Sequence, residues 1–419
     1  MSDVTGGMVI KETQNQRHGL EVADVFRLYG PAYRRDHPLP LSHLKVMRAI
    51  ETCRTDKLGG HVDTCDQCGF ERFSYNSCRN RHCPKCQTMA KTVWLEKRKA
   101  ELLPVGYFHN VFTLPHELNP LTLCNKKIIF DILFQSVSGT LQGFAADPRH
   151  GLQGKLGFTA ILHTWDQRLR DHIHLHCLIP GGAISEDGRR WVSARDNFLF
   201  PTKAISMVFR GKFIDALQQA YTEDKLIFPG KTAEFASEQG FALLLEQLWK
   251  KEWVVYSVKP FAGPEKVLDY LGRYTHRVAI ANHRITSIND GMVTFRYRDR
   301  AHDNQVKEMT LAAEEFIRRF LLHVLPDGYM RIRHFGFLAN RHKKEYLALC
   351  RKQLNCQSES SEPEHMDAHT ILLHLTGLDL DRCPHCKQGT MHFSRELPKP
   401  VPLFHSSGKQ LSLPGIDSS

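Results

Sequence analysis

The first regular pattern of hydrophobic positions lies between residues 20 and 58. Apolar side chains recur there three or four positions apart, the spacing that places them on one face of an α-helix. Proline interrupts such a pattern because it lacks the N–H group of a helical hydrogen bond. The segment is therefore predicted to form two helices, with breaks at Pro31, Pro38 and Pro40.

A loop-rich, cysteine-rich stretch follows, opened by Gly59 and Gly60 and ending near residue 88. Paired glycines are typical of loops because glycine tolerates backbone angles that other residues avoid. Helical spacing returns at residues 93–103 and ends at Pro104. The first part of the chain therefore predicts a compact module, which we place at residues 18–103.

Strand patterns dominate the next part of the chain. Residues 107–114 have the composition of a strand, and residues 128–141 have the spacing of a helix. Two further strands are predicted at 158–165 and 174–179, on either side of the polar sequence RLRD. A connection this short favours an antiparallel hairpin.

Mixed patterns continue to about residue 345, beyond which the chain turns polar. Pro264 marks one helix start, because proline suits the first helical position and Glu265 suits the first turn. SESSEPEH at 358–365 predicts a flexible linker, and roughly the last 20 residues predict disorder. The predicted helices are 205–221, 240–250, 264–277 and 312–322, and the predicted strands are 253–258, 278–285 and 292–297.

The charge of the chain narrows its partners. It carries 56 Lys and Arg against 45 Asp and Glu, a formal net charge of +11, which attracts polyanions such as nucleic acid. No segment approaches the ~20 apolar residues that span a bilayer, and the first residues lack the layout of a signal peptide. We therefore expect a cytoplasmic protein, whose 12 cysteines are metal ligands rather than disulfides.

Four cysteines have the spacing of a zinc site. Cys65 and Cys68 form one C-x2-C pair, and Cys83 and Cys86 form a second pair after 14 intervening residues. Each pair turns two thiolates toward one point, so two pairs complete a tetrahedral shell of four sulfur atoms. Zinc bound there would contribute about 10–16 kcal/mol to the folding of a segment that has little core of its own.

Other residues leave further ligand sets open. Three of them lie near the four cysteines and could replace a ligand or bind a second ion: Cys78, His61 and His82. A last C-x2-C pair, Cys383 and Cys386, could form a site with Cys350 and Cys356. The irregular spacing of that set equally fits a tail without metal.

Histidines provide a second chemical signal, on the predicted strand 174–179. Side chains two apart on a strand face the same way, so His174 and His176 present two imidazoles to one point while Leu175 and Cys177 face the core. A divalent ion could be held between the two imidazoles. His172 continues the row, but it lies about 13 Å from His176 at ~3.3 Å per residue, too far for all three to share one ion.

Such an ion needs a third ligand from elsewhere. If the hairpin pairs Gln167 with His172, then His163 faces His176 across the two strands. His163 is then the favoured third ligand, and Gln167 is the alternative.

A third signal lies on the helix that begins at Pro264. Tyr270 and Tyr274 are four residues apart, which on a helix puts both on one face, about 6 Å apart along the axis. Both hydroxyl groups can therefore reach one site. Arg273 stands between them and carries a charge suited to a phosphate group.

In this order, the three signals resemble the HUH endonucleases. More narrowly, the chain is similar to the two-tyrosine transposases of rolling-circle insertion sequences, the IS91 family. The resemblance spans roughly residues 40–345. It is carried by SCRNRHCPKCQ at 77–87, LHTWDQ at 162–167, HLHCLIPGG at 174–182, KPFAGPEKVLDYLGRYTHRVAIANHR at 259–284 and MRIRHFGFLANR at 330–341.

The resemblance implies an α+β fold, in which a ferredoxin-like antiparallel sheet carries the histidine pair on a central strand with the tyrosine helix beside it. The expected domains are a helical segment and zinc-binding module at 18–103, a nuclease domain at 104–345, and a polar, partly disordered tail with a C-x2-C knuckle at 346–419. Such a protein would work in bacterial cytoplasm, associated with the nucleoid when active.

The resemblance also implies an activity, the cutting and rejoining of single-stranded DNA at the ends of a mobile element and in target DNA. Tyr270 and Tyr274, assisted by Arg273, would form 5′-phosphotyrosine intermediates. Zn²⁺ would be structural, and Mg²⁺ or Mn²⁺ at the histidines would be catalytic. The rival hypotheses are a plasmid relaxase or rolling-circle replication initiator, which uses the same chemistry, and a zinc-dependent DNA-binding regulator without catalysis.

Overall fold

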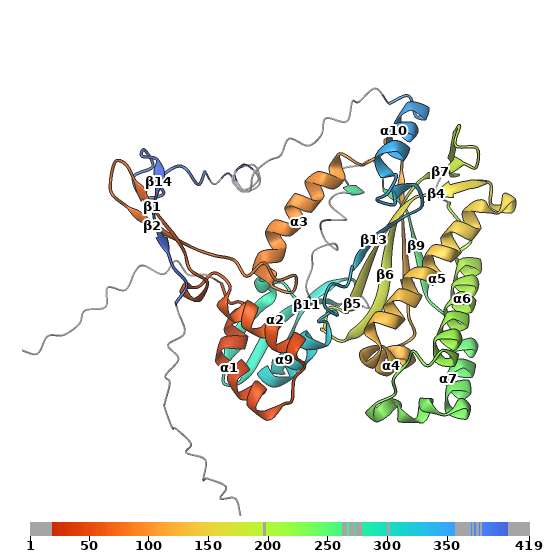
Figure 1. The fold of residues 1–419 in the computed structure, drawn as a ribbon, viewed down its shortest axis with the longest axis horizontal. Coiled ribbons are helices and arrows are strands. Elements are labelled where there is room, and N and C mark those ends of the chain that lie inside the picture. Colours follow the sequence, from red (N-terminus) through yellow and green to blue (C-terminus); the bar gives the residue numbers. More distant parts are fainter. Residues whose placement is uncertain are drawn as a thin grey trace, which may run out of the picture. The chain divides into compact units, whose positions relative to one another are not determined.

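The chain forms two compact units in the computed structural model (Figure 1). The larger unit comprises Met1–Glu51 and Arg79–Leu378, and the smaller comprises Thr52–Cys78 and Asp379–Ser419. This division differs from the domain boundaries expected from the sequence, because residues 379–400 fold with the segment that ends at Cys78. The structure describes residues 19–195, 198–261, 266–267, 272, 279–299, 302–356, 370, 373, 377 and 379–400.

A five-stranded antiparallel sheet forms the centre of the larger unit (Figure 1). Its central strand is β6, the strand that carries the paired histidines. The expected antiparallel sheet with the histidines on a central strand is thus confirmed. In spatial order the strands are β13 (Ile332–Phe335), β5 (Phe158–Trp165), β6 (Asp171–Pro180), β3 (Tyr107–Thr113) and β9 (Val255–Phe261).

The hairpin of β5 and β6 is confirmed, but its register differs by two residues from the expected one. His163 pairs with His174 rather than with His176. The reason is the turn that joins the strands, which the side chain of Asp166 closes by accepting N–H bonds from Arg168 and Arg170. A shift of two residues leaves every side chain on its original face of the sheet.

One face of this sheet is the hydrophobic core. Leu175 and Cys177 of β6 are fully buried on it, as the sequence predicted. Helices α5 (Lys126–Ala146) and α6 (Thr202–Thr222) contribute most of the opposing side chains, and α7 (Glu238–Lys250) packs beside them. Among the described residues, α5 alone has the length and apolar composition of a membrane span, and it lies mostly buried in this core.

The N-terminal helices belong to the larger unit. Helices α1 (Val22–Asp36) and α2 (Leu41–Thr52) confirm the two predicted helices, but α1 runs through Pro31 instead of breaking there. Its buried face includes Phe26, whose ring meets Phe320 edge-on at 5.2 Å. Packing of this kind compensates for the one hydrogen bond that a proline removes.

The segment after residue 279 differs most from expectation. The strand expected at 278–285 begins only at Ile285, because Asn282–Arg284 form a 3-10 turn. Among the elements here that were not predicted, β12 and α10 are rich in charged and polar residues and so lack a hydrophobic pattern. The elements here are β10 (Ile285–Asn289), β11 (Met292–Asp299), β12 (Gln305–Ala312), α9 (Ala313–Leu322) and α10 (Lys343–Gln353).

The remaining elements of the larger unit are helix α3, which contributes to the site described below, and several short or peripheral elements. They are α3 (Pro84–Lys99), α4 (Asn119–Cys124), β4 (Gly154–Leu156), β7 (Gly182–Ser185), β8 (Trp191–Ser193) and the 3-10 turns η2 (His116–Leu118), η3 (Pro148–His150), η4 (Gly230–Ala236), η5 (Asn282–Arg284) and η6 (Gly336–Leu338).

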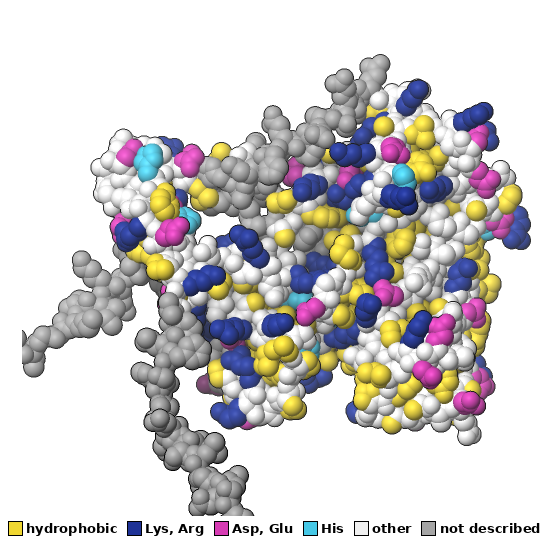
Figure 2. All heavy atoms as spheres, viewed as in Figure 1, with side chains coloured by type: hydrophobic (Ala, Val, Ile, Leu, Met, Phe, Trp, Pro, Cys, Tyr) yellow, Lys and Arg dark blue, Asp and Glu magenta, His cyan; other side chains and the backbone are white. Residues whose placement is uncertain are grey.

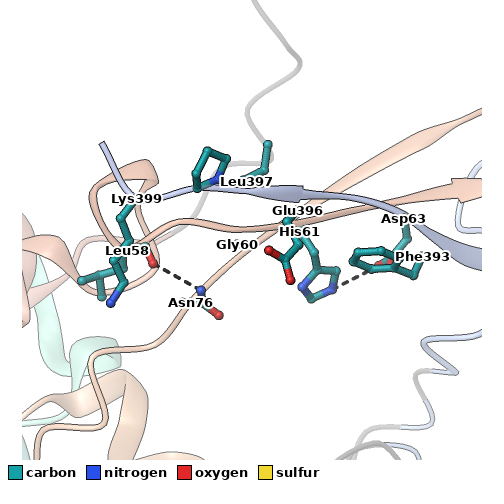
Figure 3. Close-up of a pocket in the computed structure, with 10 residues that line it drawn as sticks. Leu58, Gly60, His61, Asp63, Asn76, Phe393, Glu396, Leu397 and Lys399 are labelled. Carbon is teal, nitrogen blue, oxygen red and sulfur yellow. Dashed lines mark hydrogen bonds and ion pairs between the residues drawn. The ribbon is translucent and has the colours of Figure 1, made fainter. Parts of the chain in front are cut away.

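The smaller unit is a three-stranded antiparallel sheet built from both of its segments. β1 (Gly60–Cys65) lies between β2 (Glu71–Tyr75) and β14 (Met391–Leu397), and η1 (Asp56–Leu58) precedes β1. The segment expected to be a polar tail thus contains a strand, because β14 finds hydrogen-bonding partners on β1. Both segments also line a surface pocket of about 500 Å³, where His61 of β1 lies beside Glu396 of β14 (Figure 3).

The end of β13 requires a glycine. Gly336 has φ +61°, and a Cβ atom there would overlap the carbonyl oxygen of Leu156. We predict that Gly336→Ala lowers the free energy of unfolding by about 1–3 kcal/mol more than Gly328→Ala does. Gly328 is the matched control, since its φ is +68° and its Cβ would meet nothing within 4 Å. Urea titrations of both variants measure the difference, and equal losses would contradict the overlap.

Candidate active site and metal centres

Three histidines converge on the second face of the central sheet. His163 on β5 and His174 and His176 on β6 have ligand nitrogens that all lie within 4.8 Å of one another. The side chains share a face because His163 is paired directly with His174, and His176 stands two residues further along β6. All three are buried, with at most 8% of their surface exposed.

The hydrogen bonds of the pair on β6 fix which nitrogen faces the shared point. Nδ1 of His174 lies 2.8 Å from the carbonyl oxygen of His172, so that nitrogen carries the proton and Nε2 keeps its lone pair. The Nε2 atoms of His174 and His176 are 3.1 Å apart. Two ligands about 2.1 Å from an octahedral ion would be about 3.0 Å apart. The three imidazoles therefore fit one divalent ion.

A fourth histidine, His109 of β3, supports this group and was not identified from the sequence. Its Nε2 lies 2.9 Å from Nδ1 of His176, and the two rings are stacked. Metal-bound histidines commonly donate their second N–H to such a partner, which fixes the orientation of the ring. The strand that contains His109 was predicted, but its pairing with β6 depends on long-range contacts.

Gln167 and His172, the other residues near the histidine pair, lie in and next to the turn between β5 and β6. Gln167 is part of the turn between β5 and β6, where its backbone carbonyl accepts a bond from Arg284. His172 is exposed, with its ring centroid 4.6 Å from that of His174. Of the two proposed third ligands, the structure thus brings His163 to the pair on β6.

A separate polar group on the same face holds a half-buried histidine between two protein partners. His334 of β13 lies between the hydroxyl of Thr159 and the guanidinium of Arg98, at 2.9 and 3.1 Å. Burial, together with Arg98 and Lys343, lowers the pKa of His334 to about 3. This imidazole is therefore neutral at pH 7, and protein groups satisfy both of its nitrogens.

The described parts of the tyrosine segment lie on the histidine-bearing face. Val267 is fully buried against Ile161, two residues before His163 on β5, and Leu178, two residues after His176 on β6. A Cβ atom on Gly272 would be 3.1 Å from Leu95 of α3, so glycine permits a close approach to that helix. Tyr270, Arg273 and Tyr274 lie outside the described residues.

The smaller unit contains a group of four cysteines that differs from the predicted one. Cys65 and Cys68 lie with Cys383 and Cys386, and all four sulfur atoms are within 4.8 Å of one another. The sequence also allows a site of Cys383 and Cys386 with Cys350, but Cys350 lies in an apolar cluster of the larger unit. Burial raises the pKa of that thiol to about 12.

Cys83 and Cys86, the second pair of the predicted zinc site, belong to the larger unit. Cys83 is the N-cap residue of α3, and Cys86 lies in its first turn. Cys78 belongs to the smaller unit, where its N–H donates to the sulfur of Cys53 at 3.5 Å. Pairing of Cys65 and Cys68 with a distant C-x2-C segment left no signal in local spacing, because the two segments are separated by most of the chain.

The two nearby histidines have other partners. Nε2 of His82 accepts the N–H of Leu325 at 3.2 Å, and burial is the main cause that lowers its pKa to about 3. His61 in the smaller unit lies 3.5 Å from the carboxylate of Asp63.

Two family models match the chain. Residues 25–114 match the transposase zinc-binding domain, and residues 157–345 match the family described as "Putative transposase". The second match contains all three histidines of the group and both tyrosines. The first contains Cys65, Cys68, Cys83 and Cys86 but ends well before Cys383.

Solved structures that resemble the chain include two of the conjugative relaxase TrwC in complex with OriT DNA, one of them copper-bound and the other metal-bound. Each is 12% identical to this chain, with TM-scores of 0.23 and 0.24. The first similarity covers 39% of this chain and 68% of the relaxase chain, and the second covers 61% and 95%. Because these TM-scores are low, the fold is assigned from the strand order described above and not from these two structures.

Curated relatives match almost the whole chain. Putative transposase y4qJ of Sinorhizobium fredii is 49% identical over 381 residues, which are 90% of this chain and 95% of that protein. The transposase for insertion sequence element IS801 of Pseudomonas savastanoi pv. phaseolicola is 28% identical over 324 residues, 77% of this chain and 76% of that protein. The chain therefore belongs to the IS91 family of transposases that carry an N-terminal zinc-binding domain.

Proposed function

We propose that this transposase cuts and rejoins single-stranded DNA at the ends of a mobile element through 5′-phosphotyrosine intermediates. As a member of its family, the chain is a DNA strand transferase. The observation that carries the proposal is the convergence of three buried imidazoles on the face where Val267, three residues before Tyr270, is packed. A phosphate bound near the imidazoles would then be within reach of a nucleophile from this segment.

His163, His174 and His176 would hold a divalent ion at this point. Such an ion polarises a phosphodiester as a Lewis acid. Of Mg²⁺ and Mn²⁺, the donor set favours Mn²⁺. Mg²⁺ prefers oxygen ligands and is therefore poorly suited to three imidazole nitrogens. The contact between His109 and His176 would keep the ring of His176 directed at the ion.

Tyr270 and Tyr274 are the proposed nucleophiles. The phenol oxygen of one tyrosine attacks the scissile phosphorus, the bond to the 3′-oxygen breaks, and that oxygen leaves as a 3′-hydroxyl. Because a phenol has a pKa near ~10, it must lose its proton as it attacks, and the positive charge of Arg273 favours that loss. A second 3′-hydroxyl then attacks the phosphotyrosine, which restores the tyrosine and joins the strand without a nucleotide cofactor.

The positive charge of the protein supports a nucleic-acid substrate. Figure 2 shows Lys and Arg side chains spread across one face of the larger unit, including the part formed by α1, α2 and α9. With a formal net charge of +11, such a surface attracts the phosphate backbone irrespective of base sequence. Specificity for the element ends must come from contacts with bases or with DNA shape.

One experiment tests the central proposal. The protein is incubated with labelled single-stranded oligonucleotides from the element ends and Mn²⁺, and a denaturing gel is examined for a covalent protein–DNA complex. We expect an adduct that carries label placed on the 3′ side of the cut, because the 5′ phosphate of that fragment is joined to tyrosine, while the fragment on the 5′ side is released with a 3′-hydroxyl. A protein that binds these strands without forming an adduct would be a DNA-binding regulator, and cleavage confined to a plasmid origin would indicate a relaxase or replication initiator.

Replacing the tyrosines tests the two-nucleophile mechanism. We predict that Tyr270→Phe and Tyr274→Phe each stop transposition in a mating-out assay, because each removes one of two successive nucleophiles. Tyr221→Phe is the matched control, since Tyr221 lies on α6, on the other side of the sheet. Full transposition by either Tyr270→Phe or Tyr274→Phe would leave a single nucleophile.

Metal titration decides the third ligand. His163→Ala should weaken Mn²⁺ binding at least as much as His174→Ala, and both should abolish cleavage while sparing DNA binding. Gln167→Ala should retain cleavage, because Gln167 lies in the turn beyond the end of β5. Isothermal titration with Mn²⁺ and the adduct assay provide the readouts, and the opposite pattern would make Gln167 the ligand.

The contact of His109 predicts a positioning role. His109→Ala should lower Mn²⁺ affinity by about 10–100-fold, the usual effect of losing a partner that orients a metal ligand. His109→Gln keeps a hydrogen-bond acceptor and should restore part of the affinity. The exposed His116 provides the control variant His116→Ala. Equal Mn²⁺ affinity in His109→Ala and the parent protein would show that His176 is oriented without His109.

A further inference from the structure

We propose that Cys65, Cys68, Cys383 and Cys386 bind one structural Zn²⁺ ion, so that the smaller unit is a zinc ribbon completed by the C-terminal part of the chain. The matched zinc-binding domain ends at residue 114, which leaves Cys383 and Cys386 outside it. The proposal therefore changes both the ligand set expected from the sequence and the part of the chain that the domain needs.

The distances between sulfur atoms fit a single tetrahedral ion. Cys65 lies 3.7 Å from Cys386, and Cys68 lies 3.7 Å from Cys383. Four thiolates about 2.3 Å from a tetrahedral Zn²⁺ are about 3.8 Å apart. Each short distance joins one residue of the first C-x2-C pair to one of the second, so that the two pairs face each other.

The two pairs also form the same kind of turn. In the first, the N–H of Gly69 donates to the carbonyl of Cys65, and in the second the N–H of Lys387 donates to the carbonyl of Cys383. Gly69 and Lys387 both have a positive φ, of +67° and +60°. Two matching turns that end in a left-handed residue are expected when each must direct two sulfur atoms at one ion.

Surrounding contacts hold the two turns together and approach the sulfur atoms. The carboxylate of Asp66 accepts the N–H of Thr390 at 2.8 Å, and the N–H of Gly389 points at the sulfur of Cys386 at 3.3 Å. A Cβ atom on Gly389 would overlap the sulfur of Cys65. The N–H of Gly389 thus gives the sulfur of Cys386 a partner of the kind that orients metal ligands.

The ion would supply stability that the smaller unit otherwise lacks. Its buried apolar cluster contains Met391 and the two cysteines Cys65 and Cys383, with Phe70 partly buried against them. So small a core cannot hold three strands together, whereas a structural zinc contributes folding free energy directly. The strand β14 and two ligands come from the C-terminal segment, so the N-terminal hairpin of β1 and β2 requires that segment in order to fold.

Zinc content of the full-length chain, measured by mass spectrometry of the metal, tests the shared site. The variants are Cys65→Ser with Cys68→Ser, Cys383→Ser with Cys386→Ser, and all four changes together. We expect each pair to remove one ion per chain and the four changes together to remove no more than one. Cys124→Ser, which alters a thiol in α4, is the control and should keep the parent's zinc content.

Unchanged zinc content after Cys383→Ser with Cys386→Ser would overturn the proposal and restore the set of Cys65, Cys68, Cys83 and Cys86. Loss of two ions from the fourfold variant would also overturn it, because the two pairs would then bind separate ions.

Two further measurements separate a lost site from a misfolded protein. In hydrogen exchange, Cys383→Ser with Cys386→Ser should expose the amides of β1 and β2 while those of β5 and β6 stay protected. Cys386→His keeps a zinc ligand, so we expect it to retain the ion and, after exchange for Co²⁺, to shift the visible absorption toward that of a Cys3His site. Loss of protection in β5 and β6 but not in β1 and β2, or a Co²⁺ spectrum that Cys386→His leaves unchanged, would contradict the assignment.

Discussion

The pairing of β5 with β6 is the constraint on which the site depends. It places His163 opposite His174, with His176 two residues beyond on the same face. Burying three imidazoles costs free energy unless their nitrogens find partners, and the carbonyl of His172 and the ring of His109 satisfy Nδ1 of His174 and His176. The remaining nitrogens converge on one point, so a bound ion would complete a site that the strand register has already formed.

The two proposed metal sites would differ in their chemistry. Imidazoles on the rigid central strand suit an ion that keeps open positions for a phosphate, whereas four thiolates enclose an ion completely and give it a structural role. In the smaller unit the thiolates come from two segments that join at β1 and β14. Metal binding there would connect the folding of the N-terminal hairpin to the presence of the C-terminal segment, while the sheet of the larger unit has its own extensive core.

Local patterns predicted most elements because each carries its own signal. The spacing of apolar residues predicted α1, α2, α5, α6 and α9, and the short polar connection between two strand segments predicted the hairpin that bears His174 and His176. Sequence also indicated the shared direction of those two histidines, since alternation on a strand is a local property. Charged strands such as β12 were missed because their hydrogen bonds to β11 leave no trace in hydrophobicity. The predicted break at Pro31 is wrong, because the packing of Phe26 on Phe320 supports α1 through residues that lie far apart in sequence.

By itself, the sequence determined the family, the kinds of residue available as metal ligands and nucleophiles, and the strand that carries the histidine pair. These features depend on the identity of residues and on the spacing of near neighbours. Tertiary structure decided which residues join them. The turn closed by Asp166 set the register that brings His163 to His174, and the sheet order brought His109 to His176. Pairing of β14 with β1 gave Cys65 and Cys68 different partners from the expected ones. Contacts between distant segments depend on the free energy of the whole fold, so the local spacing of residues does not predict them.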